Sequence, residues 1–174
     1  MAKDVTKVKV GTCDVSAAGT DLGHTKGGVE VSYEPSYHDI TVDEYGETIV
    51  NKKLLGEKFS VKVPLAEYTL ANLAVAIPNS TIVGTTPQKL TFGSKAGKDM
   101  LSQAVAWVFH PIDAGADKSF DINIPKGVVT STITITHVND AERAIEVTVE
   151  ALLDETADDG AYLAFIGDPA AVAA

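Results

Sequence analysis

The sequence predicts a mainly β fold, a β-sandwich of two antiparallel sheets with one flanking α-helix; an α+β domain is the alternative. Most segments alternate apolar and polar residues with the period of two that a half-buried strand requires. One segment instead has the spacing of an amphipathic helix. The 174 residues suffice for one core and are short for two, so residues 1–174 are expected to form a single domain.

Strands are expected through the first third of the chain. In the segment 29–35 apolar residues alternate with Glu30, Ser32 and Glu34, so these three side chains share one face of a strand. The glycine-containing stretch 16–28 is expected to be a turn or loop. The alternation breaks again over about 44–57, which predicts a long loop after the second strand. The expected strands are 7–15, 29–35 with its continuation 37–43, and 58–65.

One helix is expected in the segment LAEYTLANLAVAIPN. Its apolar residues recur at i, i+3, i+4 and i+7, which places them on one helical face, and Pro78 marks the end. These apolar residues are Leu70, Leu73, Ala74 and Ile77. Strands are expected again at 88–93, 98–111 and 119–125, with a short helix as the alternative around Trp107.

The clearest hairpin is predicted between 129–137 and 144–154. In the first segment threonines alternate with Ile133 and Ile135, and Asn139 and Asp140 supply turn chemistry. In the second, inward-facing Ile145, Val147 and Val149 alternate with outward-facing Glu146, Thr148 and Glu150. A polar turn and a short apolar strand follow. The N-terminal arm 1–6 and the tail 168–174 are expected to be flexible or to make contacts between copies.

Composition and charge exclude several classes of function. The net charge is −10 and the chain holds one arginine, Arg143, so no basic stripe for gripping phosphates is present. The single cysteine, Cys13, allows no intrachain disulfide, which fits a reducing cytoplasm, and a half-buried strand position is expected for it. No membrane-spanning segment and no secretory signal are expected.

Motifs for catalysis or metal binding are not found. The segment GSKAGKD (93–99) approaches a phosphate-binding P-loop, but its glycines are one residue too close and Asp99 replaces the hydroxyl. The carboxylates of DETADD (154–159) lack the spacing of a calcium loop. The histidines lie singly along the chain, without the paired spacing of a zinc site: His24, His38, His110 and His137. We therefore expect no enzyme activity, no cofactor and no metal.

The predicted loop 44–57 contains too many apolar side chains for a solvated connection. Loops of more than about 12 to 15 residues without secondary structure are uncommon and usually functional. The loop either folds back on its own core or buries these residues on a neighbouring copy, and the tyrosines beside it favour a contact surface. The candidate contact residues are Tyr45, Ile49, Val50, Leu54 and Leu55.

The order of these segments resembles the bacteriophage tail tube protein, the major tail protein of long non-contractile tails. The resemblance rests on VEVSYEPSYHDITVDEYGE, a long loop, EKFSVKVPL, a helix, and the terminal VTVEALLDETADDGAYLAFIGD. In the terminal stretch, Asp154, Gly160, Phe165 and Gly167 occur in the expected order. The likeness covers nearly the whole chain, in loose patterns. An appended immunoglobulin-like domain, found in some members, is absent from this sequence.

The resemblance implies a virion structural protein that forms homohexameric rings stacked into a tail tube. Sheets of the ring would join into one β-barrel around a channel for double-stranded DNA during ejection, and the loop at about 44–57 would reach a neighbour. The implied partners are other copies of the chain, a tape measure protein, and tail terminator and tail-tip proteins. The implied location is the virion, after assembly in the host cytoplasm.

A negatively charged channel would repel DNA phosphates and let the genome slide. The hypothesis places five residues on the channel wall: Glu30, Ser32, Glu34, Glu146 and Glu150. An ordinary solvated outer face is the alternative for these residues. The alternatives for the protein are a monomeric immunoglobulin-like binding or adhesion module on a virion surface, and a carbohydrate-active enzyme that uses the acidic strand faces.

Overall fold

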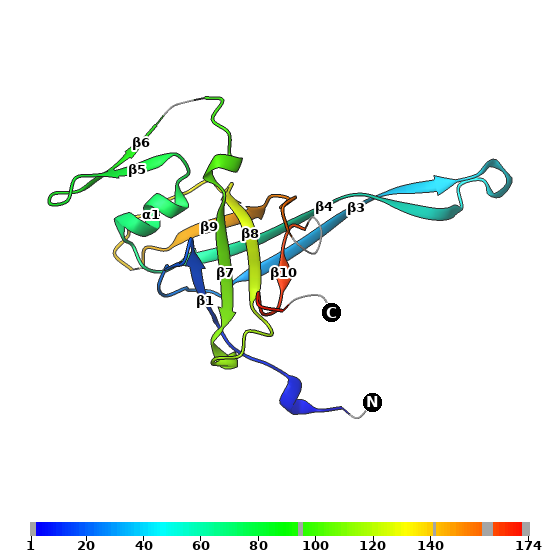
Figure 1. Cartoon of the computed structure of the whole chain (residues 1–174), viewed down its shortest axis with the longest axis horizontal. Coiled ribbons are helices and arrows are strands. Elements are labelled where there is room, and N and C mark those ends of the chain that lie inside the picture. The colour runs from blue at the N-terminus through cyan, green and yellow to red at the C-terminus, as the bar shows by residue number, and fades with distance from the viewer. Residues whose placement is uncertain (1–2, 94–95, 141, 158–161, 172–174) are drawn as a thin grey trace.

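The computed structural model confirms a mainly β chain with antiparallel strands and one α-helix (Figure 1). It describes residues 3–93, 96–140, 142–157 and 162–171. The helix, α1, spans Leu70–Ala76. The strands are β1 Cys13–Ala17, β2 Thr20–Asp21, β3 Glu30–Thr41, β4 Ile49–Leu65, β5 Ser80–Val83, β6 Lys89–Phe92, β7 Val105–Pro111, β8 Ile122–Val129, β9 Ile145–Ala151 and β10 Phe165–Ile166.

Eight strands form one antiparallel sheet in the order β2-β1-β7-β8-β9-β4-β3, with β10 paired to β8. The strands β5 and β6 form a separate small sheet. The large sheet curls on itself, because the segment after β2 bonds the end of β4: the Lys26 backbone N–H donates to the Pro64 carbonyl, and that of Ala66 to the His24 carbonyl, at 2.9 and 2.8 Å. The two halves of the sheet thus enclose one core, which is consistent with the predicted sandwich.

The core is built from the inward-facing residues of both halves. Along the last five residues of β4 and the first five of β9 every second residue is buried, as the alternation predicted, and the fully buried set is Val61, Val63, Leu65, Ile145, Val147 and Val149. The opposite half contributes Val15 of β1, and Trp107 and Phe109 of β7, whose rings stack with centroids 6.3 Å apart. Burial of this apolar surface is the main force that holds the sheet curled.

The helix α1 covers one end of the core (Figure 1). The Thr69 side chain accepts a hydrogen bond from the Asn72 backbone N–H at 3.1 Å, so the helix begins with an N-cap. Leu73 and Ala76 are buried, and the helix ends just before Pro78. The predicted helix is therefore confirmed, although only Leu73 of its predicted apolar face is fully buried.

The predicted long loop at 44–57 is wrong. Asp43–Tyr45 form one 3₁₀ turn, and residues 49–57 are the first part of β4, paired with β3 from Thr41↔Ile49 to Pro35↔Glu57. The alternation is lost here for two reasons. The hairpin has register irregularities between Ser36 and Tyr37 and between Ile40 and Thr41, and both faces of its distal half are exposed, so neither face needs to be apolar.

The predicted strand 129–137 is also wrong beyond its first residue. The strand β8 ends at Val129, and β9 pairs with β8 rather than with a strand at 130–137. Residues 131–136 keep the alternating burial of a strand, with Ile133 and Ile135 packed against the core, but no ladder includes them. Similarly, residues 7–12 lie outside any strand, since β1 begins only at Cys13. The short β5 was not predicted.

The strand predicted at 98–111 is wrong over 98–104, because Leu101–Gln103 form a 3₁₀ turn and β7 begins only at Val105.

Several predictions concern single residues. Cys13 lies half-buried in β1, as expected. Asp154 is held by Lys126 of β8 at 2.9 Å, and the hydrogen bonds from Lys126 and Thr156 lower the pKa of its carboxyl to about 2. Phe165 lies in β10, directly before Ile166 and Gly167. Gly160 and the chain ends 1–2 and 172–174 lie outside the described residues.

Candidate assembly surface

The hairpin of β3 and β4 projects far beyond the core of the molecule (Figure 1). Its distal part carries all five apolar residues that the sequence singled out for contacts with another copy. They lie on the 3₁₀ turn and on the first half of β4, and between 46% and 67% of each is exposed: Tyr45, Ile49, Val50, Leu54 and Leu55. They contribute nothing to the core of their own chain. The structure therefore places them along the exposed, projecting half of the hairpin.

The outer edge of β3 is open. In the described part of the chain β3 pairs only with β4, which leaves the backbone groups along one side of a twelve-residue strand without a ladder partner. Pro35 lies in the middle of β3, and proline is tolerated in a sheet at such an edge. An exposed edge of this length is a template for pairing with another chain.

The five residues predicted for a channel wall share one face of the sheet. Glu30, Ser32 and Glu34 alternate along β3, and their partners on β4 are Lys62, Ser60 and Lys58. Glu150 of β9 lies opposite Ser60, and Glu146 lies opposite Pro64. Because directly paired residues point to the same side of a sheet, these residues form one polar face across β3, β4 and β9. Sequence reasoning missed the two lysines.

This polar face, defined by the residues just named, is acidic in sum but locally mixed. Its four carboxylates and two lysines leave a net charge of −2. Lys62 forms an ion pair with Glu146 at 2.6 Å, and this hydrogen-bonded partner raises the pKa of the Lys62 ammonium. Among the described residues, neither Glu30 nor Glu34 has a base within ion-pair distance. These two carboxylates at the open edge can therefore form ion pairs with basic groups of another molecule.

The opposite face of β3 is apolar and only partly covered. Val31 and Tyr33 lie opposite Val61 and Phe59, yet 40% of Val31 and 54% of Tyr33 is exposed. The Tyr33 hydroxyl donates to the Glu57 carboxylate, and this bond raises the pKa of the phenol. The open edge thus has a polar side with two glutamates and an apolar side with a valine and a tyrosine.

A histidine–aspartate pair is the arrangement nearest to catalytic chemistry. The Nδ1 atom of His110 lies 2.5 Å from Asp121 Oδ1, and its Nε2 atom lies 2.7 Å from the Gly115 carbonyl oxygen. Both ring nitrogens are therefore bonded to the protein itself. The bond to Asp121 is the main cause of a raised His110 pKa. Burial raises the pKa of the nearby Cys13 thiol, which disfavours a nucleophilic thiolate. The pair serves to tie β7 to the start of β8.

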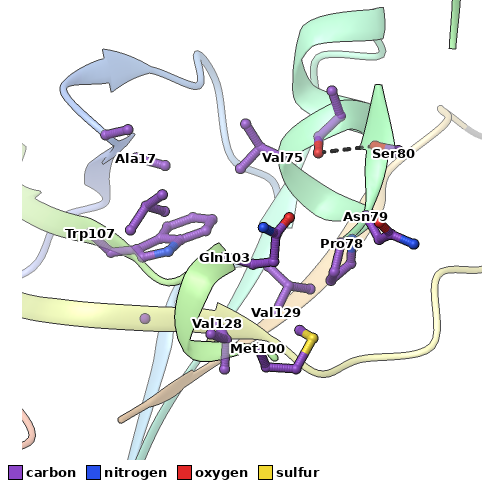
Figure 2. A pocket seen from close by; sticks show the side chains of 14 residues that line it. Ala17, Val75, Pro78, Asn79, Ser80, Met100, Gln103, Trp107, Val128 and Val129 are labelled. Atoms are coloured by element: carbon purple, nitrogen blue, oxygen red, sulfur yellow. Dashed lines mark hydrogen bonds between the residues drawn. The ribbon is translucent and has the colours of Figure 1, made fainter. Parts of the chain in front are cut away.

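One cavity of about 210 Å³ lies between α1, β7 and β8 (Figure 2). Trp107, Val75, Val129 and Met100 line it, together with the amides of Gln103 and Asn79 and the hydroxyl of Ser80. The buried indole N–H of Trp107 has no hydrogen-bond partner in the described chain. The Ser80 hydroxyl donates to the Ala74 carbonyl oxygen at 3.3 Å. No acidic or basic side chain lines the cavity, so it offers no group for proton transfer at neutral pH.

Comparisons with known proteins add no identification. No protein-family model matches the chain, and neither does any curated protein. Among the described residues, no group of three or more His, Cys, Asp or Glu side chains is placed to hold a metal ion. Within the same residues, no helix has the length and apolar character needed to cross a membrane.

Proposed function

We propose that the chain is a structural protein that assembles with copies of itself into hexameric rings stacked as a bacteriophage tail tube. One observation supports this proposal above all others. The β3–β4 hairpin leaves a long strand edge unpaired and carries five exposed apolar side chains at its tip, neither of which stabilises the isolated chain. Both features would stabilise an assembly in which neighbouring copies pair with the strand edge and bury the apolar side chains.

The free energy available from the tip is sufficient to matter for assembly. Full burial of a leucine, isoleucine or valine side chain contributes roughly 1.5 to 3 kcal/mol. Each tip residue is about half exposed, so covering it on a neighbour contributes on the order of 1 kcal/mol. Five such residues, repeated in every copy, supply a contact energy of the size that stabilises specific interfaces after the cost of association.

The polar face suits the wall of a channel that passes DNA. Its net negative charge repels phosphates, while Lys58 and Lys62 divide the carboxylates and keep the repulsion moderate. The channel wall is proposed to consist of this face, with Glu30, Ser32 and Glu34 nearest the joint between copies. Tape measure, tail terminator and tail-tip proteins are the further partners proposed from the family resemblance, in the virion after cytoplasmic assembly.

Electron microscopy and size-exclusion chromatography of the purified protein test this proposal. We expect rings or tubes whose formation depends on protein concentration. The variant Leu54→Ser/Leu55→Ser should raise the concentration needed for assembly about tenfold or more, because two apolar contacts are lost. The matched control Ile82→Ser/Val83→Ser changes two exposed residues on the small β5–β6 sheet and should assemble like the wild type.

A monomeric binding or adhesion module is the competing function, and the same experiment separates the two. A particle of about 18 kDa at all concentrations, with no effect of either variant on its size, would favour the monomeric module and contradict the tube.

A further inference from the structure

Residues 3–12, called the N-terminal arm from here on, are a second exposed feature of the described chain. Within the arm, Val5–Lys7 form one 3₁₀ turn, Lys9 lies 4.0 Å from the Asp113 carboxylate, and the Thr12 carbonyl accepts a hydrogen bond from the Ile112 backbone N–H. In the described chain, no apolar side chain of the arm packs in the core. It extends away from the core (Figure 1) and lies outside every strand of the described chain. Val8 is 70% exposed and Val10 is 89% exposed, which is unusual for two valines in one short segment. Lys7 and Lys9 alternate with these valines, so in an extended conformation the arm would have one basic face and one apolar face.

The open edge of β3 has the complementary pattern. Glu30 and Glu34 lie on its polar side, and the half-exposed Val31 and Tyr33 lie on its apolar side. If residues 7–10 were added to this edge as a strand, with the polar faces of both strands on the same side, Lys7 and Lys9 would lie beside the two glutamates. The same strand would set Val8 and Val10 beside Val31 and Tyr33.

A shift of one residue would reverse both sets of contacts. Lysines would then meet the apolar side of the edge and valines the acidic side. The alternation of apolar and polar side chains and the attraction of opposite charges therefore favour the same register of the added strand.

We propose that the N-terminal arm of one copy pairs as an additional β-strand with the free edge of β3 in the next copy. The arm does not cover the edge of its own chain, since its valines are exposed in the structure. It leaves from β1, which lies next to the end strand β2, whereas β3 lies at the other end of the strand order of the sheet. A donor at one end and an acceptor at the other give a head-to-tail contact, which closes into a ring or continues as a filament.

This joint deepens the proposed function and rests on it, because it names the segment that connects neighbouring copies of the tube. It also assigns a role to two glutamates on the polar face. Glu30 and Glu34 would lie beside Lys7 and Lys9 of the neighbour, whereas Glu150 and the Lys62-paired Glu146 on β9 would still face the channel.

Charge reversal on the full-length chain tests the joint. Lys7→Glu/Lys9→Glu replaces attraction to Glu30 and Glu34, one contact directly across the ladder and the other diagonal, by repulsion, and should raise the concentration needed for assembly about tenfold or more. Adding Glu30→Lys/Glu34→Lys to the same chain should restore assembly, since arm and edge are again complementary. The control Lys89→Glu/Lys118→Glu makes the same change in net charge at exposed lysines outside the arm and β3 and should have no effect.

Cysteine cross-linking in a Cys13→Ser background gives a second measurement. Val10→Cys combined with Val31→Cys or with Tyr33→Cys should yield a ladder of disulfide-linked copies under oxidation, because these side chains share a face. Val10→Cys with Ser32→Cys places the two thiols on opposite faces and should yield no ladder.

The possible results separate the joint from the proposed function. Wild-type tubes together with unaltered assembly of Lys7→Glu/Lys9→Glu would overturn the joint alone. A cross-linked ladder without any ring or tube would support the joint and overturn the tail tube. Cross-linking within single chains only, or no restoration by the double reversal, would overturn the joint.

Discussion

At the scale of single residues, the packing of Trp107 depends on a missing side chain. The backbone of Gly127 lies against the edge of the indole ring, and a Cβ atom there would lie 2.5 Å from Trp107 Cδ1 and 2.8 Å from Val149 Cγ1. Both neighbours are buried in the core and cannot move without disturbing other contacts. The glycine is therefore required for close approach rather than for a special backbone angle.

We expect Gly127→Ala to lower the free energy of unfolding by about 1 to 3 kcal/mol, as overpacking of a core does. Urea denaturation followed by the fluorescence of Trp107, the sole tryptophan, measures this directly. Gly56→Ala is the matched control, because its new Cβ would meet only Ser36 Oγ at 3.7 Å. Equal stability of the two variants would contradict the packing described for Trp107.

The ion pair between His110 and Asp121 makes stability depend on pH. The hydrogen bond to Asp121 raises the pKa of His110 above its unfolded value of 6.5. The ion pair therefore stabilises the folded state fully at pH values below the unfolded pKa of His110. This stabilisation is lost as the pH rises through the higher pKa that His110 has in the folded state.

We expect the stability difference between the wild type and His110→Gln to shrink as the pH is raised from about 6 to about 8. His38→Gln, at an exposed hairpin position, is the control. Urea denaturation at a series of pH values measures both differences. A difference that stays constant or grows with pH would show that His110 is not held as a cation.

At the scale of elements, the distal part of the β3–β4 hairpin is expected to serve assembly and is not needed for folding. All of its buried residues lie in the proximal part of β4, from Val61 onward, so the distal part is dispensable for the core. Replacing residues 37–55 by Asn-Gly would join the directly paired Ser36 and Gly56 through a tight turn suited to a hairpin.

We expect this shortened chain to unfold within about 0.5 kcal/mol of the wild type, because no core contact is removed. It should form no tubes at concentrations where the wild type does. Urea denaturation and electron microscopy provide the two readings. If the shortened chain formed tubes of ordinary length, the distal part of the hairpin would not belong to the assembly surface.

The elements that could be predicted from the sequence are those with one buried face. The alternation along 58–65 and 144–151 predicted the buried sides of β4 and β9, and the 3.6-residue spacing predicted α1. The distal hairpin was taken for a loop because neither of its faces is buried in the chain itself. The segment 130–137 has strong alternation, but Ile133 and Ile135 pack on the core without a neighbouring strand to pair with.

The candidate surface was predicted more fully in its residues than in its shape. The five apolar residues are exposed along the projecting hairpin and the five polar residues share one face, while their contacts with another copy stay a prediction. The lysines between the glutamates, the open edge of β3 and the fit of the arm to that edge depend on strand pairing. Pairing brings together residues about 25 positions apart, such as Glu34 with Lys58, which no local pattern specifies.

At the scale of the whole molecule, charge distinguishes a passive channel from a DNA-binding surface. The polar face has a net charge of −2, and Glu146→Lys/Glu150→Lys would change it to +2 without altering the edge of β3. We expect tubes of this variant to retain double-stranded DNA at about 50 mM salt and to release it near 200 mM. Wild-type tubes should not retain it.

Co-sedimentation of DNA with tubes measures this retention. The control Asp14→Lys/Glu155→Lys makes the same change in charge away from the polar face. DNA retained equally by both variants would show that total charge, rather than this face, decides the result.

The central claim is that identical copies complete each other's β-structure, and electron cryo-microscopy of the assembled protein tests it most directly. We expect stacked rings in which a strand from the neighbouring copy continues the ladder along the outer edge of β3, with the hairpin tip covered. Separate particles of about 18 kDa at every concentration, or rings in which that edge still faces water, would contradict the claim.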